Sequence, residues 1–401
     1  MTRFSRWFFV MLAAGLALLA AACGGAGIPA PTLEAAATPT AMQPPTWTPL
    51  PTSTPLPTPT PTPPPSWQMA QSWRPPTGWQ FTAGFLAPDG QTVIAFAMED
   101  VAEIDLDTLD MTMYVYRLGS RQPLWEGSLL QHFGLRQVDN AFWLPDGLLV
   151  LDGINTDLDP GLRVVNLDTM EVVWRREMVI LDYGLNRVAY DAARQYLILN
   201  LYGVRGLQVY TWPGREKVDE KYTASDMSNG CCIPELLYTS QHGIATMGVQ
   251  IFNPQRYYLM IWDGSGPQAR QFPTDYTQKN WFNQRVVWGP KQQVGWIFMP
   301  ATLDSPELAV LDIFDLTTGQ VAWSVTEQDF PGLSSLAWLP QRGWLVGSQS
   351  GEVRLYTDAQ TYETVRSRSS ALLFYELQTT EAHNDRWLGV SDSRIELWVW
   401  K

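Results

Sequence analysis

A turn signal that returns every 42 to 57 residues constrains this chain more than any other feature of its sequence. One complete unit runs from Leu333 to Val365, where four short runs with strand character are separated by turns. Its first turn contains Arg342-Gly343, and the corresponding turns elsewhere contain Asp89-Gly90, Asp146-Gly147, Ala193-Arg194, His242-Gly243, Lys291-Gln292 and Asn384-Asp385. The third-to-fourth strand turns form a second series, at Gly119, Asp168, Gly214, Gly264, Gly319 and Ala359.

A single four-stranded meander exposes two edges and a face that it cannot bury, so several copies are needed to make a core. A repeat of roughly 40 to 50 residues matches one propeller blade. The sequence therefore predicts an all-β fold: a seven-bladed β-propeller of four-stranded antiparallel blades. The predicted blades cover residues 79–128, 136–178, 185–223, 233–274, 284–327, 333–367 and 371–401. Six or eight blades are the alternatives, because the fourth copy is irregular.

The last predicted blade contains only three strands, so another segment must supply its outer strand. Residues 67–73, with the sequence WQMAQSW, have strand character and lie at the start of the repeat region. We expect this N-terminal strand to complete the last blade, which closes the ring and removes an exposed edge.

Two kinds of repeat motif connect the chain to known propeller families. Residues 347–356 (GSQSGEVRLY) and 390–398 (VSDSRIELW) resemble the turn and third strand of WD-repeat propellers. Residues 166–174 (NLDTMEVVW) and 315–323 (DLTTGQVAW) resemble the repeats of quinoprotein-like propellers. The chain has only three histidines and one Trp-Asp dipeptide, Trp262-Asp263, so the quinoprotein-like class fits better. The resemblance covers residues 67–401 and implies a propeller fold.

The first 22 residues are typical of a bacterial export signal. Arg3 and Arg6 precede an apolar run at residues 7–19, which is shorter than a membrane-spanning helix. Residues 19–24 (LAAACG) resemble a lipoprotein processing site, which implies that Cys23 carries the lipid. Residues 1–22 are thus predicted to be a signal peptide, and cleavage by an ordinary signal peptidase is the alternative.

Residues 23–66 are predicted to form a disordered spacer, because they are rich in proline and threonine and nearly free of charge. The expected product is a monomeric domain in the cell envelope, anchored to the membrane by its lipid and facing the outside or the periplasm. The net charge of −13 excludes nucleic acid as a favoured partner, since the phosphates would be repelled.

In such a propeller, the loops after each fourth strand share a face with the loops between second and third strands. On this face, two neighbouring predicted blades place the carboxylates Glu99, Asp100, Glu103, Asp105, Asp107, Asp152, Asp157 and Asp159. Asn155, Asp157 and Asp159 also partly resemble the start of an EF-hand, which would imply calcium. A solvated acidic rim without a metal is the favoured interpretation.

The same face is predicted to carry aromatic residues that either bind a partner or pack onto the blades. The candidates for binding are Tyr276, Trp281 and Phe282, and further aromatic loop residues are His132, Phe133, Tyr183 and Phe330. Trp125, Trp174 and Trp323 occupy one position of the fourth strand and are expected to pack between blades.

Cys231 and Cys232 lie in a loop of this face and could form a vicinal disulfide after export. Quinoprotein alcohol dehydrogenases use such a pair beside pyrroloquinoline quinone, but no matching calcium ligands or catalytic aspartate can be assigned here. No nucleophile-elbow or phosphate-binding motif occurs either. We therefore expect a non-enzymatic module that binds a protein or glycan without a cofactor. The alternative is a quinone-dependent dehydrogenase or a hydrolase with its site at the central channel.

Overall fold

The structure is a computed structural model, and the residues that it describes all lie in the second of the two compact units of the chain, Met1–Pro64 and Pro65–Lys401. The described residues are 65–101, 105, 108–177, 188–192, 194–200, 207–218, 235–240, 243–250, 256–262, 270–273, 284–290, 292–298, 310–367, 376–380 and 382–401. The predicted signal peptide, the predicted lipidation site Cys23 and nearly all of the predicted spacer lie outside them. Within the described ranges, no helix has the length and apolar character needed to cross a membrane.

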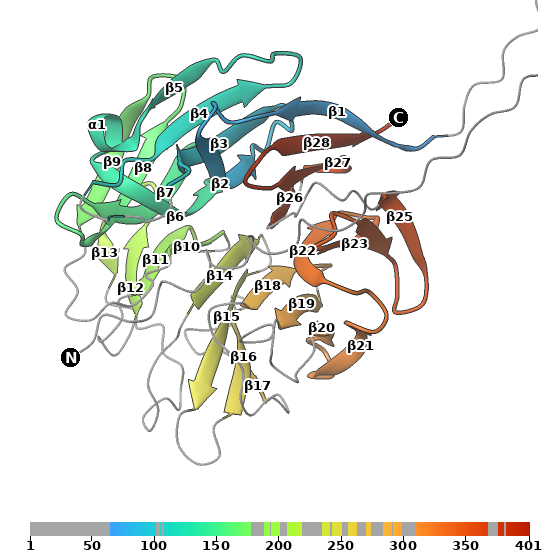
Figure 1. Cartoon of the computed structure of the whole chain (residues 1–401). Coiled ribbons are helices and arrows are strands. Elements are labelled where there is room, and N and C mark those ends of the chain that lie inside the picture. The colour runs from blue at the N-terminus through green and yellow to red at the C-terminus, as the bar shows by residue number, and fades with distance from the viewer. Residues whose placement is uncertain are drawn as a thin grey trace, which may run out of the picture. The chain divides into compact units, whose positions relative to one another are not determined.

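The second unit is built from four-stranded antiparallel sheets (Figure 1). The first two sheets in the chain are β2 (Trp79–Leu86), β3 (Thr92–Glu99), β4 (Thr112–Arg117) and β5 (Trp125–Ser128), then β6 (Leu135–Trp143), β7 (Leu149–Asn155), β8 (Pro160–Asn166) and β9 (Glu171–Glu177). The next two are β10 (Val188–Asp191), β11 (Tyr196–Asn200), β12 (Leu207–Thr211) and β13 (Lys217–Val218), then β14 (Glu235–Ser240), β15 (Gly243–Gln250), β16 (Arg256–Trp262) and β17 (Arg270–Pro273).

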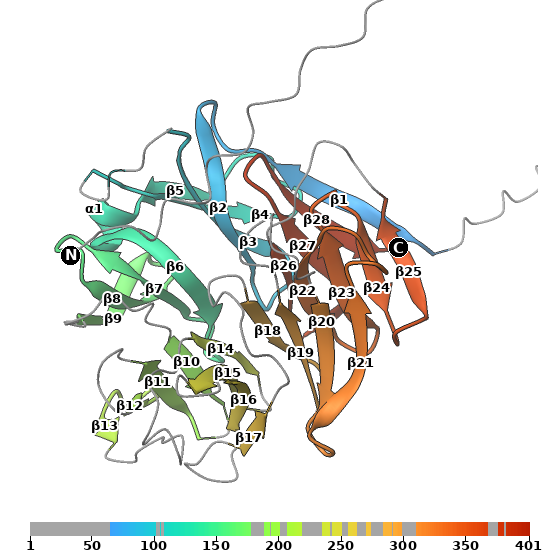
Figure 2. The same cartoon turned by 60° about the horizontal axis from the view of Figure 1, so that its bottom comes forward.

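Three sheets complete the unit, and their outer strands lie at its periphery (Figure 2). They are β18 (Gln284–Trp288), β19 (Gln293–Phe298), β20 (Val310–Asp315) and β21 (Gln320–Thr326), then β22 (Leu333–Leu339), β23 (Gly343–Ser348), β24 (Val353–Tyr356) and β25 (Tyr362–Arg366), and finally β26 (Glu376–Thr380), β27 (His383–Val390) and β28 (Ile395–Trp400) with β1 (Trp67–Trp73). A short helix, α1 (Leu129–Phe133), connects β5 to β6.

Five described hydrophobic clusters join six of these sheets in one series. They lie between β10–β13 and β6–β9, between β6–β9 and β2–β5, between β2–β5 and the β26–β28/β1 sheet, between that sheet and β22–β25, and between β22–β25 and β18–β21. Buried aliphatic and aromatic side chains such as Phe96, Val150, Val346 and Leu397 fill these clusters. Each cluster draws side chains from two neighbouring sheets, so the four sheets inside this series bury both of their faces.

The prediction of a seven-bladed propeller is wrong, because the packing of the described residues defines six blades. The β14–β17 sheet has four paired strands, but no described hydrophobic cluster joins it to β10–β13 or to β18–β21. The prediction was based on the spacing of turns, and this spacing shows only where pairs of strands follow each other along the chain. Turn spacing alone therefore does not give the number of blades in the ring.

The N-terminal strand closes the last sheet, as predicted. β1 pairs antiparallel with β28, from Trp67 opposite Trp400 to Trp73 opposite Ile395. Two backbone bonds extend the ladder by one step, from Ser66 N to Lys401 O at 2.8 Å and from Lys401 N to Ser66 O at 3.1 Å. The strand that follows the predicted spacer therefore holds the two ends of the repeat region together.

The fourth-strand tryptophans pack between sheets, which confirms their expected role. Trp174 lies 5.5 Å from Tyr210 and 6.0 Å from Trp212 of the next sheet, measured between ring centroids. The Trp323 ring likewise lies 6.3 Å from the ring of Tyr356 in the next sheet, β22–β25. These large rings fill the outer part of each interface, where the sheets diverge.

Candidate functional site

Carboxylates on two adjacent blades lie at the predicted face. Glu99, Asp100 and Asp105 are exposed at or after the end of β3, and Asp157 is exposed in the β7–β8 turn with Asp159 half-buried beside it. Asp152 does not belong to this rim: its residue is only 1% exposed, within β7. Glu103 and Asp107 lie outside the described residues.

The β7–β8 turn is held by the side chain of Asn155. Its Oδ1 accepts hydrogen bonds from the backbone N–H groups of Asp157 (2.8 Å) and Asp159 (3.0 Å), and its Nδ2 donates to Glu177 Oε2 at 2.9 Å. Asparagine commonly stabilises turns in this way. The resemblance to an EF-hand start thus has a structural cause. Among the described residues, no group of three or more potential ligands is placed to hold a metal ion.

This turn also presents an apolar side chain to solvent. Leu158 has a φ of 64° and is 38% exposed, and Val101, in the loop after β3, is 41% exposed. Non-glycine residues seldom adopt a positive φ. The Asn155 hydrogen bonds hold the turn in this conformation, and they therefore also fix the direction of the Leu158 side chain. We call Val101 and Leu158, together with Glu99, Asp100 and Asp157, the loop-tip surface.

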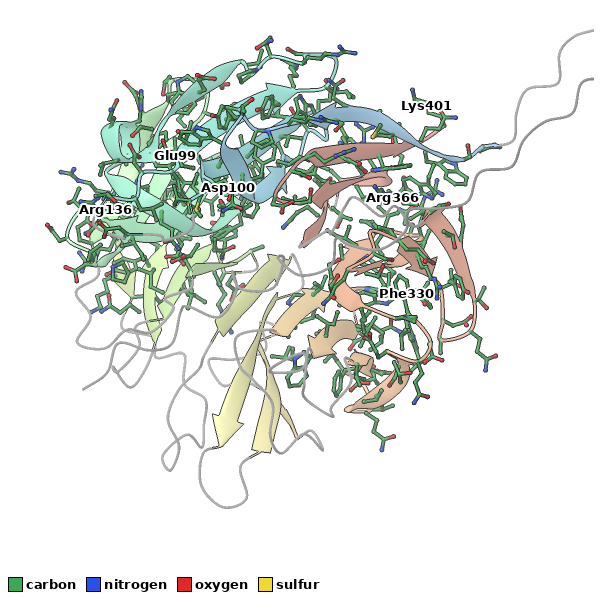
Figure 3. All side chains as sticks on the ribbon, viewed as in Figure 1. Glu99, Asp100, Arg136, Phe330, Arg366 and Lys401 are labelled. Atoms are coloured by element: carbon green, nitrogen blue, oxygen red, sulfur yellow. The ribbon has the colours of Figure 1, made fainter. Side chains whose placement is uncertain are left out.

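Arg136, at the start of β6, connects the loops of the two blades. Its carbonyl oxygen accepts a hydrogen bond from Met111 N at 3.0 Å, and its Nε donates to Thr156 O at 3.5 Å. Figure 3 shows Glu99, Asp100 and Arg136 on the same side of the unit. Arg136, Val101 and Leu158 were not predicted from the sequence, because single exposed residues of these types carry no motif.

Two of the described aromatic loop residues, Phe133 and Phe330, are buried on the blades, whereas His132 is exposed. Phe133 is 3% exposed and Phe330 is 1% exposed, each in a hydrophobic cluster. His132 makes an edge-on contact with Trp125, with ring centroids 5.1 Å apart. The other candidates, Tyr183, Tyr276, Trp281, Phe282, Cys231 and Cys232, lie outside the described residues.

A groove of about 800 Å³ lies between α1 and β9, on the flank of the β6–β9 blade. Its lining residues are Leu130, Gln131, His132, Phe133, Gly134, Arg163, Met170, Glu171, Val172, Val173 and Arg175. The α1 wall is fixed at its start by Asp110, which accepts from Ser128 Oγ at 2.6 Å and from Leu130 N at 3.2 Å. At its end, Arg163 Nε donates to Phe133 O at 2.7 Å.

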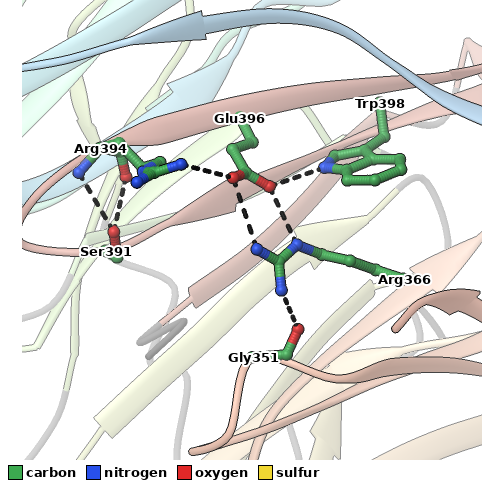
Figure 4. Close-up of polar contacts among 6 residues, drawn as sticks. All are labelled: Gly351, Arg366, Ser391, Arg394, Glu396 and Trp398. Atoms are coloured by element: carbon green, nitrogen blue, oxygen red, sulfur yellow. Dashed lines mark hydrogen bonds and ion pairs between the residues drawn. The ribbon is translucent and has the colours of Figure 1, made fainter. Parts of the chain in front are cut away.

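A buried charged network lies between the last two blades (Figure 4). Glu396 is 2% exposed and accepts from Arg366 at 3.0 and 3.5 Å and from Trp398 Nε1 at 3.0 Å. Arg366 is 7% exposed and also donates to Gly351 O. Arg394 Nη1 approaches the same carboxylate at 3.6 Å. Because this carboxylate is surrounded by donors, the network has a clear structural role in joining the blades.

Asp312 on β20 is a buried carboxylate of a different kind. It is 4% exposed and accepts a hydrogen bond from Ser324 Oγ at 2.5 Å. Burial raises the pKa of Asp312 above its ordinary value, and the Ser324 bond offsets part of that rise. The side chain lies within a sheet away from the loop-tip surface, so we assign it no part in binding.

Comparison with known proteins identifies the fold. The chain is similar to the crystal structure of the WD40 β-propeller domain of Doa1, with a TM-score of 0.52 and 12% identity over 83% of this chain and 96% of that one. No protein-family model and no curated protein matches the sequence. At this identity, the similarity establishes a WD40-like β-propeller fold and nothing about the partner.

Proposed function

We propose that this protein is a non-enzymatic protein-binding module, and that its partner contacts the loop-tip surface. The observation that carries the proposal is the fixed exposure of Leu158, whose turn is held by three Asn155 hydrogen bonds. A preordered apolar side chain binds with a smaller loss of conformational entropy than a mobile one. A WD40-like propeller supplies the rigid support that such loops need.

The composition of the surface favours a protein partner over a glycan. Aliphatic side chains surrounded by carboxylates suit a partner that offers an apolar pocket with basic residues at its rim. Sugar binding relies mainly on stacking against exposed aromatic rings, and the described aromatic loop residues Phe133 and Phe330 are buried.

The test removes the apolar tip without disturbing the turn. Leu158→Asn suits this purpose, because asparagine tolerates positive φ better than leucine does. A partner would be captured from native cell envelope with the full chain, and its Kd then measured with purified components. We expect weakening by about fivefold, corresponding to roughly 1 kcal/mol for a partly exposed leucine.

The matched control is Leu124→Asn. Leu124 is 61% exposed in the β4–β5 turn, and loops of that class emerge at the opposite end of the strands. Equal weakening by both variants would indicate a nonspecific loss of apolar surface, and unchanged binding by Leu158→Asn would refute the chosen surface.

We also propose that Cys23 anchors the domain in the cell envelope through a lipid. Cys23→Ala should release the mature chain from the membrane fraction and lower its mass by the lipid in addition to the substitution itself. A mass that falls by the substitution alone would reject the anchor. The proposed role includes no catalysis. Quinone absorbance and turnover after reconstitution with pyrroloquinoline quinone and calcium would contradict it.

A further inference from the structure

Arg342, in the turn between β22 and β23, stacks on the strand pair that closes the last blade. Its Cζ lies 4.6 Å from the ring centroid of Trp400 and 5.6 Å from that of Trp67. The two tryptophans are paired in the β1–β28 ladder, and their ring centroids are 5.4 Å apart. Cation–π contact with two indole rings therefore holds the guanidinium in one place.

The turn that carries Arg342 is also fixed by the neighbouring blade. Asn384 Nδ2, on β27, donates a hydrogen bond to Gln341 Oε1 at 2.9 Å, and Arg342 N donates to Leu339 O at 3.1 Å. Gln341 has a φ of 62°, and these contacts stabilise that uncommon conformation. The Arg342 side chain is thus ordered before any ligand arrives, which lowers the entropic cost of binding.

The Arg342 side chain lacks the acceptors that half-buried arginines have elsewhere in the domain. Among the described residues, the other buried or half-buried arginines each form a hydrogen bond or an ion pair through the side chain: Arg136, Arg163, Arg194, Arg354, Arg366, Arg386 and Arg394. Arg342 is half-buried, bonds no described residue in this way, and has its Nε buried without a partner. A partly desolvated charge without an acceptor is costly, so an anion beside it is favourable.

Arg354, in the same blade, shows how such a stacked guanidinium is completed. Its Cζ lies 4.2 Å from the ring centroid of Phe330 and 4.5 Å from that of Tyr362, and its Nε donates to Glu352 Oε1 at 2.7 Å. Stacking uses the faces of the guanidinium and leaves its N–H groups at the edge for oxygen atoms. The faces of Arg342 are used in the same way, so an oxyanion from outside the fold would complete the arrangement.

The described carboxylates in the adjoining turns are already occupied. Asp385, at the start of β27, pairs with Arg386 at 2.8 Å. Asp358, in the β24–β25 turn, accepts two backbone N–H bonds of its own turn, each at 2.8 Å. Neither carboxylate forms an ion pair with Arg342, although the net charge of the chain is −13.

We propose that Arg342 binds the phosphate group of a membrane phospholipid. A guanidinium forms bidentate hydrogen bonds with phosphate. Trp67 and Trp400 lie beneath it, and Lys401, the next residue after Trp400, is exposed. Indole rings together with basic side chains are typical of protein surfaces at the lipid–water interface.

The place where the chain enters the domain favours a lipid phosphate over a soluble one. The predicted spacer joins the domain at Ser66, directly before β1, so this step rests on the proposed lipid at Cys23. Such a tether presents headgroups at a roughly millimolar effective concentration, which a soluble anion does not gain. First-to-second strand turns emerge at the opposite end of the strands from the loop-tip surface, so headgroup binding would direct that surface away from the membrane.

The test uses the mature chain, residues 23–401 with Cys23→Ala, so that neither a lipid nor the predicted signal peptide contributes. The indole N–H signals are followed by NMR during titration with dihexanoylphosphatidylglycerol below its micelle concentration. We expect saturable shifts of the Trp67 and Trp400 signals, which are assigned from Trp67→Phe and Trp400→Phe, and weaker binding at higher salt. Because this chain carries no Cys23, the result is independent of the mass measurement on the anchor.

Two variants locate the site, after urea midpoints have established that both are folded. Arg342→Gln should weaken binding by about fivefold or more, because the guanidinium is the phosphate ligand. The matched control is Arg121→Gln, which removes the same charge from an exposed position in the β4–β5 turn, at the same end of the strands. Its binding should be unchanged.

Shifts that are lost in Arg342→Gln and kept in Arg121→Gln, with flotation of the chain on phosphatidylglycerol vesicles that shows the same dependence, would support the proposal. The absence of any shift with the lipid, or an equal loss in both variants, would overturn it. Binding of inorganic phosphate or glycerol 3-phosphate at Arg342 without binding to the vesicles would assign the site to a soluble anion and would also overturn it.

Discussion

Removing the Glu396 carboxylate is the sharpest test of how the last two blades are joined. Glu396→Ala would leave the Arg366 guanidinium, only 7% exposed, without its charged partner. Breaking a buried ion pair from one side costs about 3–5 kcal/mol, because a desolvated charge remains. Trp398 Nε1 would lose its 3.0 Å acceptor as well, which places the expected loss toward the upper end of that range.

The measurement is thermal and urea unfolding of the full chain. With an unfolding entropy of about 2.1 cal/mol/K per residue, the Pro65–Lys401 unit has a total of roughly 0.7 kcal/mol/K. A loss of about 3–5 kcal/mol therefore corresponds to a fall in Tm of roughly 4–7 °C. The urea midpoint should fall while the m-value stays constant, because the same surface is exposed on unfolding.

A double-mutant cycle separates the ion pair from the space that it fills. Arg366→Met with Glu396→Leu should restore most of the stability that Glu396→Ala loses, since neither variant residue leaves a buried charge. Arg394→Met is the control: Arg394 faces the same carboxylate at 3.6 Å but is 26% exposed, so its loss should be below about 1 kcal/mol. If the double variant loses as much free energy of unfolding as the single variants Arg366→Met and Glu396→Leu lose together, the two side chains are not coupled and the prediction is wrong.

Two further predictions concern stability. Burial raises the pKa of Asp312, so the folded state binds the carboxyl proton more tightly than the unfolded state does. The protonated carboxyl group stabilises the fold fully below the unfolded-state pKa. This stabilisation is lost as the pH rises through the folded-state pKa. Asp312→Asn should therefore be more stable than wild type at neutral pH, with a gap that narrows in urea titrations toward pH 4; a gap independent of pH would contradict this. Gly343→Ala should destabilise by about 1–3 kcal/mol, because the new Cβ would lie 2.2 Å from Tyr356 O at a φ of 145°. Gly119→Ala, at a φ of 91° with no atom within 4 Å, should lose only about 1 kcal/mol from backbone strain, and equal losses in the two variants would exclude the clash.

Local patterns predicted the strands and turns well, because both depend on neighbouring residues. The expected closing strand at residues 67–73 has the same bounds as β1. The Asn166 and Asp315 motifs mark third-to-fourth strand turns in which these side chains accept backbone N–H bonds, from Asp168 at 2.9 Å and from Thr317 at 2.7 Å. Such motifs identify hairpins reliably, because the side chain and its backbone partner are only two residues apart.

The candidate site was harder to predict, because exposure depends on contacts between blades. Asp152 has the same residue type as its neighbours in the predicted rim, yet it is buried within β7. The segment containing His132 and Phe133 forms α1, whose Phe133 fills a cluster shared by two blades. Neither outcome follows from the surrounding residues, since both depend on which sheet lies opposite.

One spatial position repeats across blades although its residue type does not. On the third strand, the side chain that faces the preceding blade is Arg163 in β8, Arg354 in β24 and Glu396 in β28. Arg163 reaches Phe133 O at 2.7 Å, Arg354 reaches Asp329 O at 3.0 Å, and Glu396 pairs with Arg366 at 3.0 Å. In each case the partner lies at the end of the preceding blade or in the connection that follows it.

A search by residue type misses this device, because a carbonyl oxygen requires a donor whereas an arginine requires an acceptor. Its effect is nevertheless the same at these three interfaces: a charged side chain from the third strand fixes the end of the preceding blade or the segment that connects it to the next. Those segments belong to the face on which the loop-tip surface lies. Arg163 thus fixes the end of α1 on the blade whose β7–β8 turn, held by Asn155, belongs to the loop-tip surface.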